Sequence, residues 1–506
     1  MIRHSIQTGE RNAMHYFEEW TLPEERGTIP YFETISEYLE FITDKFADNT
    51  ALSDSERAFT YRQMGERVAR KRAFLAGLQL PGSGNIGLLD VNSIDLVEWF
   101  LAVTTSGYTA VMIPAQLSPE VLAGASRLYE LHAMIAGEIL MPKTAMVPVP
   151  VYPAASMAGE GVPAVKVEKK TPAAIFFTGG TTGAPKGVVL NNGALVRGFL
   201  NGTYRDRQTM FGQTVVSALP LTHVFGMVFS TMSILYCGGH VGMCAQMRDL
   251  FKEMMRVHPT TMIAVPGMAE IMLGVAKMRG FGALGGALKL IICGAAPVPP
   301  RLREGFKPFG VSVLAGYGMT ETANLVSGNL EMDRDPYSVG HQYPEQEIRI
   351  VNGEIQVKGD MLFDGYWKNP EATKEALTED GWLRTGDLGN VDKDGFIHIV
   401  GRIKNLIILP NGENVSPEEV EDIYYRSALL KDCLVYEDEI AGEPSIVIEI
   451  QPMEGVTDEA MLEEADRIAK TLPTTMRPAK VIIRREDFAK SPSMKIIRGK
   501  GGKKPQ

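Results

Sequence analysis

A loop rich in glycine and threonine follows a short apolar stretch in the first half of the chain. Residues 175–177, Ile-Phe-Phe, run directly into Thr-Gly-Gly-Thr-Thr-Gly-Ala-Pro-Lys-Gly at 178–187. Backbone N–H groups, Thr hydroxyls and one ammonium can all donate to phosphate oxygens. The P-loop of nucleotide triphosphatases is a different motif, because it needs Gly-Lys-Ser/Thr opening a helix, whereas Lys186 lies between Pro185 and Gly187. A glycine-rich surface turn is the alternative that the loop alone leaves open.

Other side chains of suitable chemistry lie further along the chain. Tyr317 offers a flat face for a base, Asp387 can accept bonds from sugar hydroxyls, and Glu321 supplies the hard oxygen that Mg²⁺ prefers. Taken singly, each has an ordinary interpretation: a core aromatic, a turn former and a solvated carboxylate. His223 near apolar residues is usually a satisfied core histidine, and Lys495 alone would indicate a solvated basic tail.

Composition narrows the classes of protein that could use these residues. The 506 residues suffice for about three structural units, and the net charge of −10 disfavours a nucleic-acid coat. Four cysteines without paired short spacing indicate buried thiols in a reducing compartment. The first 20 residues lack the apolar core of a signal peptide, and the apolar stretch 224–236 is too short to span a membrane. We therefore expect a cytoplasmic protein without an integral membrane segment, and a buried core helix at 224–236.

Elements that could position these residues alternate between strand and helix. A strand at 59–62 precedes a helix at 64–78, and strands at 86–89 and 108–113 enclose a helix at 96–103. Strand, helix, strand predicts a parallel sheet. Further strands are expected at residues 215–219, 261–265 and 288–292. The body of the chain is therefore predicted to be α/β.

The pattern of predicted secondary structure changes in the last third of the chain. From about Gly353, short alternating segments such as 354–357 and 396–400 predict small antiparallel sheets. A final unit begins with a helix capped by Ser416, where proline and two glutamates fill the first turn. A strand at 445–450, a helix at 458–472 and a strand at 480–484 complete it. We expect an N-terminal domain over residues 1–402 and a C-terminal domain over residues 403–506.

Several segments together resemble the adenylate-forming superfamily, which includes acyl- and aryl-CoA synthetases, firefly luciferase and the adenylation domains of peptide synthetases. The segments occur in the order of the family's motifs and cover the chain from about Phe32 to Arg498. Besides the loop at 178–188, they are 220–226, 294–297, 317–321, 381–387, 401–402 and 412–421. The resemblance implies a large N-terminal domain of stacked α/β sheets with a small β-barrel-like region, and a smaller, mobile α+β C-terminal domain.

The resemblance implies ATP, Mg²⁺ and CoA as cofactors and a carboxylic acid as substrate. The acid would attack the α-phosphate of ATP, giving an acyl-adenylate and pyrophosphate, and CoA would then displace AMP. The implied cofactor-binding residues are Thr178, Gly179, Gly180, Thr181, Thr182, Gly183, Lys186, Gly294, Ala295, Ala296, Tyr317, Gly318, Asp387, Arg402, Lys404 and Gly412. Glu321 and Thr181 are the implied Mg²⁺ ligands, with Thr320 beside Glu321 at the phosphates.

The same resemblance implies which residues meet the acid. These are His223, Phe225, Gly226, Val265, Gly316, Met319 and Ala323. They are mostly small or apolar, which favours a fatty or aryl monocarboxylate over an amino acid, and Gly316 is expected to leave the pocket floor open. His223 would flank the acyl carboxylate, and it is an implied catalytic residue together with Lys495, Thr320 and Glu321.

The resemblance also implies two uses for the C-terminal domain. One face would deliver Lys495 to the carboxylate and α-phosphate, and rotation about a hinge at Lys404 would then bring a face carrying Gly412 to the thiol step. Lys490 and Lys500 are rivals, but Lys495 has Arg498 three residues on, at the family spacing.

Some positions depart from the family pattern. Met494 replaces a common Gly, Gly179 a common Ser and Asn405 a common Asp, and the pair at 191–192 is Asn-Asn; none removes a charged catalytic group. Segments 179–180 and 409–412 look more like the fatty-acyl-CoA ligase branch.

The predicted activity is therefore an ATP-dependent carboxylic acid:CoA ligase. Two alternatives stay open. The acyl group could pass to the thiol of a carrier protein, or the scaffold could be a non-enzymatic nucleotide- or acyl-binding regulator.

Overall fold

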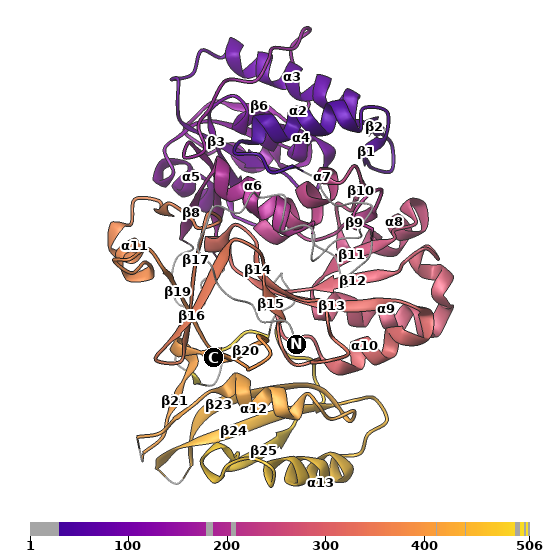
Figure 1. Ribbon diagram of the computed structural model, residues 1–506, viewed down its shortest axis with the longest axis vertical. Coiled ribbons are helices and arrows are strands. Elements are labelled where there is room, and N and C mark those ends of the chain that lie inside the picture. Colours follow the sequence, from indigo (N-terminus) through magenta and orange to yellow (C-terminus); the bar gives the residue numbers. More distant parts are fainter. Residues whose placement is uncertain are drawn as a thin grey trace.

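The computed structural model describes residues 30–178, 186–203, 209–410, 412–440, 442–490, 496–499 and 502–503. Within these ranges the chain has the predicted α/β architecture, with a large N-terminal part of two extended sheets and a smaller C-terminal part at one end (Figure 1). No helix in these ranges combines the length and apolar character needed to cross a bilayer. All four cysteines are buried and free, as expected.

The larger sheet is parallel at its centre, with antiparallel strands at its edges. In spatial order its described strands are β15 (His341–Gln342), β14 (Leu325–Asn329), β13 (Ser312–Gly318), β12 (Leu290–Cys293), β11 (Thr261–Ala264), β9 (Thr214–Ser217), β10 (His240–Met243), β1 (Thr50–Ser53) and β2 (Ala58–Thr60). The strands expected at 215–219, 261–265 and 288–292 are confirmed as β9, β11 and β12. Their parallel pairing brings the carboxyl ends of β11, β12 and β13 to one edge.

The second sheet carries the glycine-rich loop. Its strands are β18 (Gly365–Tyr366), β8 (Gly187–Asn191), β7 (Pro172–Phe177), β4 (Thr109–Ile113), β3 (Asn85–Leu89), β5 (Leu131–Ala136) and β6 (Val151–Pro153). The expected parallel pair is confirmed, since Asn85 lies opposite Thr109. β7 and β8 form an antiparallel hairpin, and β18 extends it beyond β8.

The helices pack around these sheets, and their caps are those that the sequence provides. Thr60 forms a capping box at the start of the helix expected at 64–78, and Ser93 accepts a bond from Leu96 N–H. The helices of the N-terminal part are α2 (Ile35–Lys45), α3 (Tyr61–Gly77), α4 (Ile94–Thr104), α5 (Pro119–Leu128), α6 (Asn192–Asn201), α7 (Ile234–Tyr236), α8 (Leu250–Val257), α9 (Pro266–Arg279), α10 (Pro300–Phe306) and α11 (Pro370–Ala376).

The buried helix expected at 224–236 is present, but most of it is a π-helix, η4 (Phe225–Ser233), followed by α7. Two hydroxyls support the wider turn, because Thr231 donates to the carbonyl of Gly226 and Ser233 to that of Val228, each five residues earlier. The helix therefore keeps its predicted burial and changes its winding.

The region expected to be barrel-like is an antiparallel sheet of β16 (Gln346–Val351), β17 (Glu354–Gly359), β19 (Leu383–Val391) and β20 (Ile397–Arg402). The C-terminal part follows it. Its elements are β21 (Ile407–Ile408), β22 (Asn414–Val415), α12 (Pro417–Tyr424), β23 (Leu430–Ile440), β24 (Glu443–Pro452), α13 (Asp458–Ala469) and β25 (Lys480–Ile483).

The C-terminal elements enclose a hydrophobic core of their own. Val420 and Tyr424 on α12 pack with Ile448 on β24 and Met461 on α13, apart from the main core of the N-terminal part. Ser416 caps α12 as predicted, accepting the N–H of Glu419.

Candidate active site

The β7–β8 hairpin fixes both ends of the glycine-rich loop. The N–H of Thr178 donates to the carbonyl of Lys186 at 3.0 Å, and the N–H of Lys186 donates to the Thr178 hydroxyl at 3.3 Å. Register pairing of Phe177 with Gly187 continues this contact into the sheet. The loop residues Gly179, Gly180, Thr181, Thr182 and Gly183 lie outside the described residues, so the structure places the two ends of the predicted phosphate loop.

Lys186 and Glu321 come together through an aromatic residue that neither motif contains. The Lys186 ammonium lies 4.6 Å from the ring centroid of Tyr366, and the Tyr366 hydroxyl donates to Glu321 Oε1 at 2.8 Å. Sequence reasoning missed Tyr366. The Gly-Tyr-Trp segment at 365–367 carries no signal that pairs it with Lys186 or Glu321, because the contact depends on β18 pairing with β8.

Glu321 is buried in the short 3-10 helix η8 (Thr320–Thr322), with 6% of its surface exposed, and half-buried Thr320 precedes it. Burial raises the pKa of the Glu321 carboxyl, while the Tyr366 hydrogen bond and the charges of Arg402 and Lys186 oppose that rise. The carboxylate offers the hard oxygen ligand that Mg²⁺ prefers, and the nearby Lys186 and Arg402 charges suit the phosphates that accompany the metal. Glu321 therefore fits the role of Mg²⁺ ligand that the resemblance implies.

A second cluster joins Tyr317, Asp387 and Arg402. The Tyr317 hydroxyl donates to Asp387 Oδ2 at 2.7 Å, and Arg402 Nε donates to Asp387 Oδ1 at 2.7 Å. Burial and the Asp387 charge raise the pKa of the Tyr317 phenol. Asp387 and Arg402 face each other across the β19–β20 pair, which explains why residues from separate motifs meet. A carboxylate has about four acceptor positions, so Asp387 keeps capacity for sugar hydroxyls.

The predicted adenine segment lies where β12 and β13 end. Gly294 follows β12, and a Cβ at this position would lie 2.9 Å from the Phe225 ring and 3.3 Å from the Gly316 carbonyl. Ala295 has a φ of +68°, an uncommon backbone conformation for a residue with a side chain. Gly318 ends β13, where a Cβ would meet the Asn324 carbonyl at 2.0 Å. Ala296 follows Ala295 in the chain. Residues 294–296 and Gly318 therefore form a closely packed stretch of backbone at the ends of β12 and β13.

The residues expected to meet the acid gather around the start of the π-helix and the same strand ends. The backbone carbonyl of half-buried His223 accepts the Gly226 N–H at 3.0 Å, and Phe225 packs against Gly294. Val265 caps the start of α9 after β11, and Ala323 is fully buried just after η8. The other members are Gly226, Gly316 and half-buried Met319.

The expectation of open space at Gly316 needs correction. A Cβ at Gly316 would lie 3.0 Å from one methyl carbon of Leu325 and 3.1 Å from the other. β14 pairs with β13 and brings Leu325 against this glycine. The space that a side chain at Gly316 would enter is therefore held by Leu325.

The connection between the two parts lies next to the Asp387 cluster. Exposed Lys404 lies in the 3-10 helix η9 (Ile403–Asn405), and the Asn405 amide donates to the carboxylate of Glu418 on α12. Arg498 pairs with Glu421 on the same helix. Glu418 is a second residue that sequence reasoning missed, since its acidic position in the first turn was read as favouring the helix.

The remaining C-terminal candidates differ in their surroundings. Gly412 is exposed with a φ of +84°, and a Cβ there would meet nothing within 4 Å. Lys495 and Lys500 lie outside the described residues. Lys490 is paired with Asp432 at 2.8 Å, within the C-terminal part, which disfavours it as the mobile catalytic lysine.

Comparison with known proteins shows the family to which the chain belongs. The sequence profile of a family described as "AMP-binding enzyme" matches residues 39–367. The long-chain-fatty-acid–CoA ligase FadD15 of Mycobacterium bovis is 30% identical over 316 residues, which are 53% of this chain and 52% of the relative. The chain thus spans about half the length of that relative. The 2-succinylbenzoate–CoA ligase of Bacillus cytotoxicus is 29% identical over 440 residues, 82% of this chain and 88% of the relative.

Solved structures share the fold. ATP-bound MatB from Rhodopseudomonas palustris has a TM-score of 0.80 at 24% identity, covering 91% of this chain and 97% of that one. The anthranilate CoA ligase AuaEII in complex with anthranoyl-AMP has a TM-score of 0.82 at 20% identity, covering 92% and 96%.

Proposed function

Because this chain belongs to the family of AMP-binding enzymes, we propose that it is an ATP-dependent ligase joining an apolar carboxylic acid to coenzyme A. The acid would be fatty or aryl, in keeping with the names of the relatives and the apolar residues near His223. The observation that carries the proposal is the meeting of Lys186 with Glu321 beside the Tyr317, Asp387 and Arg402 cluster.

In the first half-reaction the acid carboxylate would attack the α-phosphate of ATP and expel pyrophosphate. Lys186 and the loop ends would donate to the outer phosphates, Glu321 would hold Mg²⁺, and Asp387 would accept the ribose hydroxyls. Bound Mg²⁺ supplies charge neutralisation of the phosphates. Two anions must meet in this step, so Lys495 would add the compact mobile charge that the developing transition state needs.

In the second half-reaction the thiolate of CoA would attack the acyl carbon and release AMP. We propose that the C-terminal domain, residues 403–506, turns about Lys404 between the two steps, so that the face carrying Gly412 replaces the face carrying Lys495. Its separate hydrophobic core supports a unit that can move as one body. The four buried thiols suit a reducing compartment, and we propose the cytoplasm as its location.

The experiment is acid-dependent pyrophosphate release over fatty, aryl, dicarboxylic and amino acids, each with and without CoA. We expect one apolar acid class to release pyrophosphate, and acyl-CoA to form when CoA is present. An acyl-adenylate that CoA does not discharge would favour a carrier-protein thiol as the acceptor. Silence across the panel with ATP still bound would favour the non-enzymatic alternative.

Lys495→Ala tests the proposed catalytic charge. We expect adenylate formation to fall by about 10²- to 10³-fold, while ATP affinity changes little, because the charge is needed in the transition state. Lys490→Ala is the matched control, since Lys490 is held by Asp432 and should leave the rate near wild type. Equal adenylate formation in wild type and Lys495→Ala would refute this role.

A further inference from the structure

Tyr366 stands between two groups of the nucleotide site and touches both. Its hydroxyl donates to Glu321 Oε1 at 2.8 Å, and its ring centroid lies 4.6 Å from the Lys186 ammonium. A phenol can serve both partners at once, because its O–H points away along the ring plane while the ring face attracts a cation. Phenylalanine would keep the second contact and lose the first.

The backbone around Tyr366 is bonded to the same two neighbours. The N–H of Phe363 donates to the Glu321 carbonyl at 2.9 Å, and the N–H of Trp367 donates to the Gly187 carbonyl at 2.8 Å. In register, Tyr366 lies opposite Val188, two residues after Lys186. The five residues from 363 to 367 therefore join the turn that holds Glu321 to the strand that begins after Lys186.

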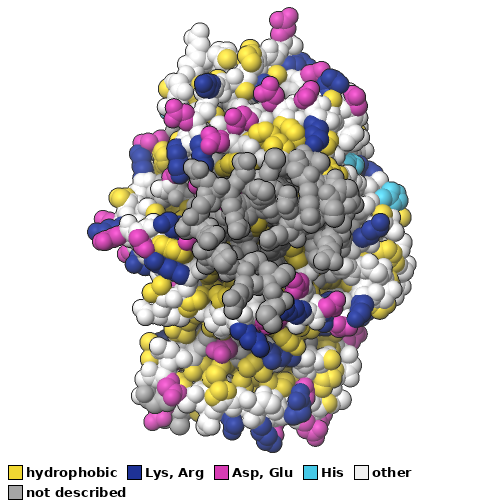
Figure 2. Space-filling model, viewed as in Figure 1, with side chains coloured by type: hydrophobic (Ala, Val, Ile, Leu, Met, Phe, Trp, Pro, Cys, Tyr) yellow, Lys and Arg dark blue, Asp and Glu magenta, His cyan; other side chains and the backbone are white. Residues whose placement is uncertain are grey.

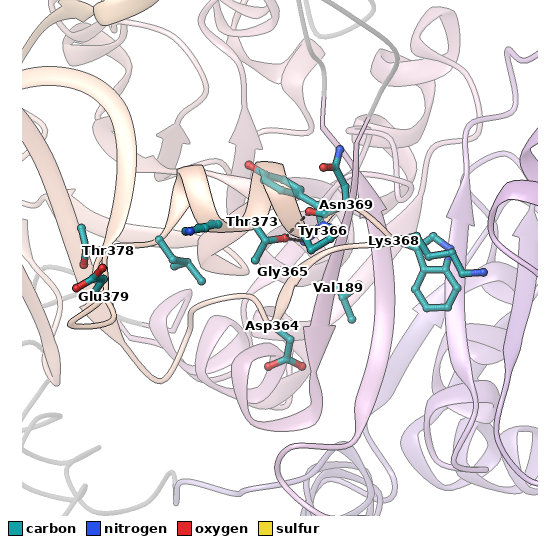
Figure 3. A pocket seen from close by; sticks show the side chains of 13 residues that line it. Val189, Asp364, Gly365, Tyr366, Lys368, Asn369, Thr373, Thr378 and Glu379 are labelled. Carbon is teal, nitrogen blue, oxygen red and sulfur yellow. Dashed lines mark hydrogen bonds between the residues drawn. The ribbon is translucent and has the colours of Figure 1, made fainter.

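Tyr366 is also held at its backbone and by a neighbouring ring. The N–H of Tyr366 donates to the Thr373 hydroxyl at 2.9 Å, and the Phe363 ring packs edge-on against it, with centroids 5.0 Å apart. Figure 3 shows Tyr366 beside Gly365 and Thr373, where β18 leads toward α11 along an open surface pocket. A side chain fixed at both ends in this way can hold its two charged neighbours at a set separation.

We propose that Tyr366 is a positioning residue of the nucleotide site. Its hydroxyl orients the Glu321 carboxylate for Mg²⁺, and its ring holds the Lys186 ammonium where the outer phosphates of ATP arrive. This inference rests on the proposed function. It assigns different tasks to the two halves of one side chain, and the two tasks can be separated by substitution.

The test measures ATP binding by calorimetry, once with Mg²⁺ and once with EDTA. For Tyr366→Phe we expect about a tenfold loss of affinity with Mg²⁺ and little change with EDTA, because the variant loses one hydrogen bond to a charged group and keeps the ring. For Tyr366→Leu we expect a loss under both conditions, several-fold with EDTA, because the ammonium also loses its aromatic partner.

Trp367→Phe is the matched control. It removes a neighbouring hydrogen bond, from the indole N–H to the Leu128 carbonyl at 2.9 Å, without touching Glu321 or Lys186. We expect wild-type ATP affinity under both conditions. If Tyr366→Leu fails to fold, the ATP affinities of Tyr366→Phe and Trp367→Phe, each with Mg²⁺ and with EDTA, are enough to test the role of the hydroxyl.

The binding measurements can contradict the role of Tyr366 and the proposed function separately. A Tyr366→Phe protein that keeps the full Mg²⁺ enhancement, or that loses affinity equally with Mg²⁺ and with EDTA, overturns the inference and leaves the proposed function intact. A wild-type protein that binds no ATP under either condition overturns the proposed function, and the inference falls with it.

Discussion

Asp422, on the C-terminal helix α12, shows how burial sets the charge of a single residue. Burial and the neighbouring Glu421 carboxylate raise the pKa of Asp422 to about 7, while Arg426 and Arg498 oppose the rise. In the unfolded chain the same carboxyl releases its proton at about 3.9. The folded protein therefore holds a proton on Asp422 over a pH range where the unfolded chain does not.

The sign of this difference predicts the effect of Asp422→Asn. As the pH rises from about 4 to 7, the unfolded chain ionises first, so the wild type loses stability that a neutral asparagine keeps. We expect no gain from the variant near pH 4, and a gain in free energy of unfolding on the order of 2 kcal/mol at pH 8, after allowing for solvent screening.

Thermal melts of wild type and variant from pH 4 to 8 check this. The same substitution at exposed Asp438 is the control and should give no gain that grows with pH. A constant offset between wild type and Asp422→Asn across the range would contradict the prediction.

For single residues, the sequence predicts which side chains belong to the site better than it predicts which of them touch. Resemblance places Tyr317, Asp387 and Arg402 in one site, and the structure brings them within hydrogen-bonding distance. Tyr366 could not be found, because its link to Glu321 arises from the pairing of β18 with β8, and no local spacing encodes that pairing. Leu325 was missed for the same reason, since it reaches Gly316 across a strand pair.

The starts of several helices are set by capping side chains that lie next to them in the sequence. Ser416 accepts an N–H in the first turn of α12, as predicted, and Thr60 and Ser93 do the same for α3 and α4. The strand expected at 59–62 is wrong at its end, because the Thr60 cap starts the helix at Tyr61. The winding of η4 did not follow from its apolar pattern. It depends on hydroxyl bonds five residues back and on the close approach of α6, which are tertiary features.

Glycines within and directly after α6 allow α6 to lie close to η4. A larger residue at one of these positions should therefore push the two helices apart. A Cβ at Gly202 would lie 2.0 Å from the Ser233 hydroxyl and 2.5 Å from the Phe229 ring. We expect Gly202→Ala to lower the free energy of unfolding by about 1–3 kcal/mol, because the π-helix must move away. Denaturant unfolding followed by circular dichroism measures this.

Gly124→Ala is the matched control, because Gly124 lies inside α5 and a Cβ there would meet nothing within 4 Å. In that helix the added methyl should raise stability by about 0.5–1 kcal/mol. Equal effects of the two substitutions would show that α6 and η4 are not closely packed.

On the scale of the whole molecule, the distribution of charge is the first feature to consider. Acidic and basic side chains are interspersed over the face shown in Figure 2. Because the net charge of the chain is −10, the anionic substrates of the proposed reaction would need local donors such as Lys186.

Two arginine–tyrosine contacts join the N-terminal and C-terminal parts, and each part supplies the arginine of one contact and the tyrosine of the other. Arg301 on α10 lies 5.8 Å from the Tyr425 ring and donates to the Lys431 carbonyl at 2.9 Å. Conversely, Arg426 lies 4.3 Å from the ring of Tyr337 in the N-terminal part. Such contacts are individually weak, about 0.5–1 kcal/mol when exposed, which suits an interface that must open.

This arrangement turns one side of the C-terminal part toward the cluster of Tyr317, Asp387 and Arg402. Arg498, three residues after Lys495, lies beside Glu418, and Glu418 bonds to Asn405 next to the Asp387 cluster. Gly412 remains exposed. Under the proposed two-step mechanism, this arrangement is the one that would serve the first half-reaction.

Loosening the two arginine contacts should affect the half-reactions unequally. For the double variant Arg301→Ala/Arg426→Ala, we expect acid-dependent ATP–pyrophosphate exchange to fall by about tenfold, because two arginine–tyrosine contacts and the Arg301–Lys431 hydrogen bond that favour the first arrangement are lost. Transfer of a supplied acyl-adenylate to CoA should be unchanged or faster, since the competing arrangement gains population. Arg467→Ala is the control: it lies on α13, at the far end of the C-terminal part in Figure 1, and pairs with Glu464 there. An equal fall in both half-reactions would mean that the contacts support folding of the C-terminal part and do not select its orientation.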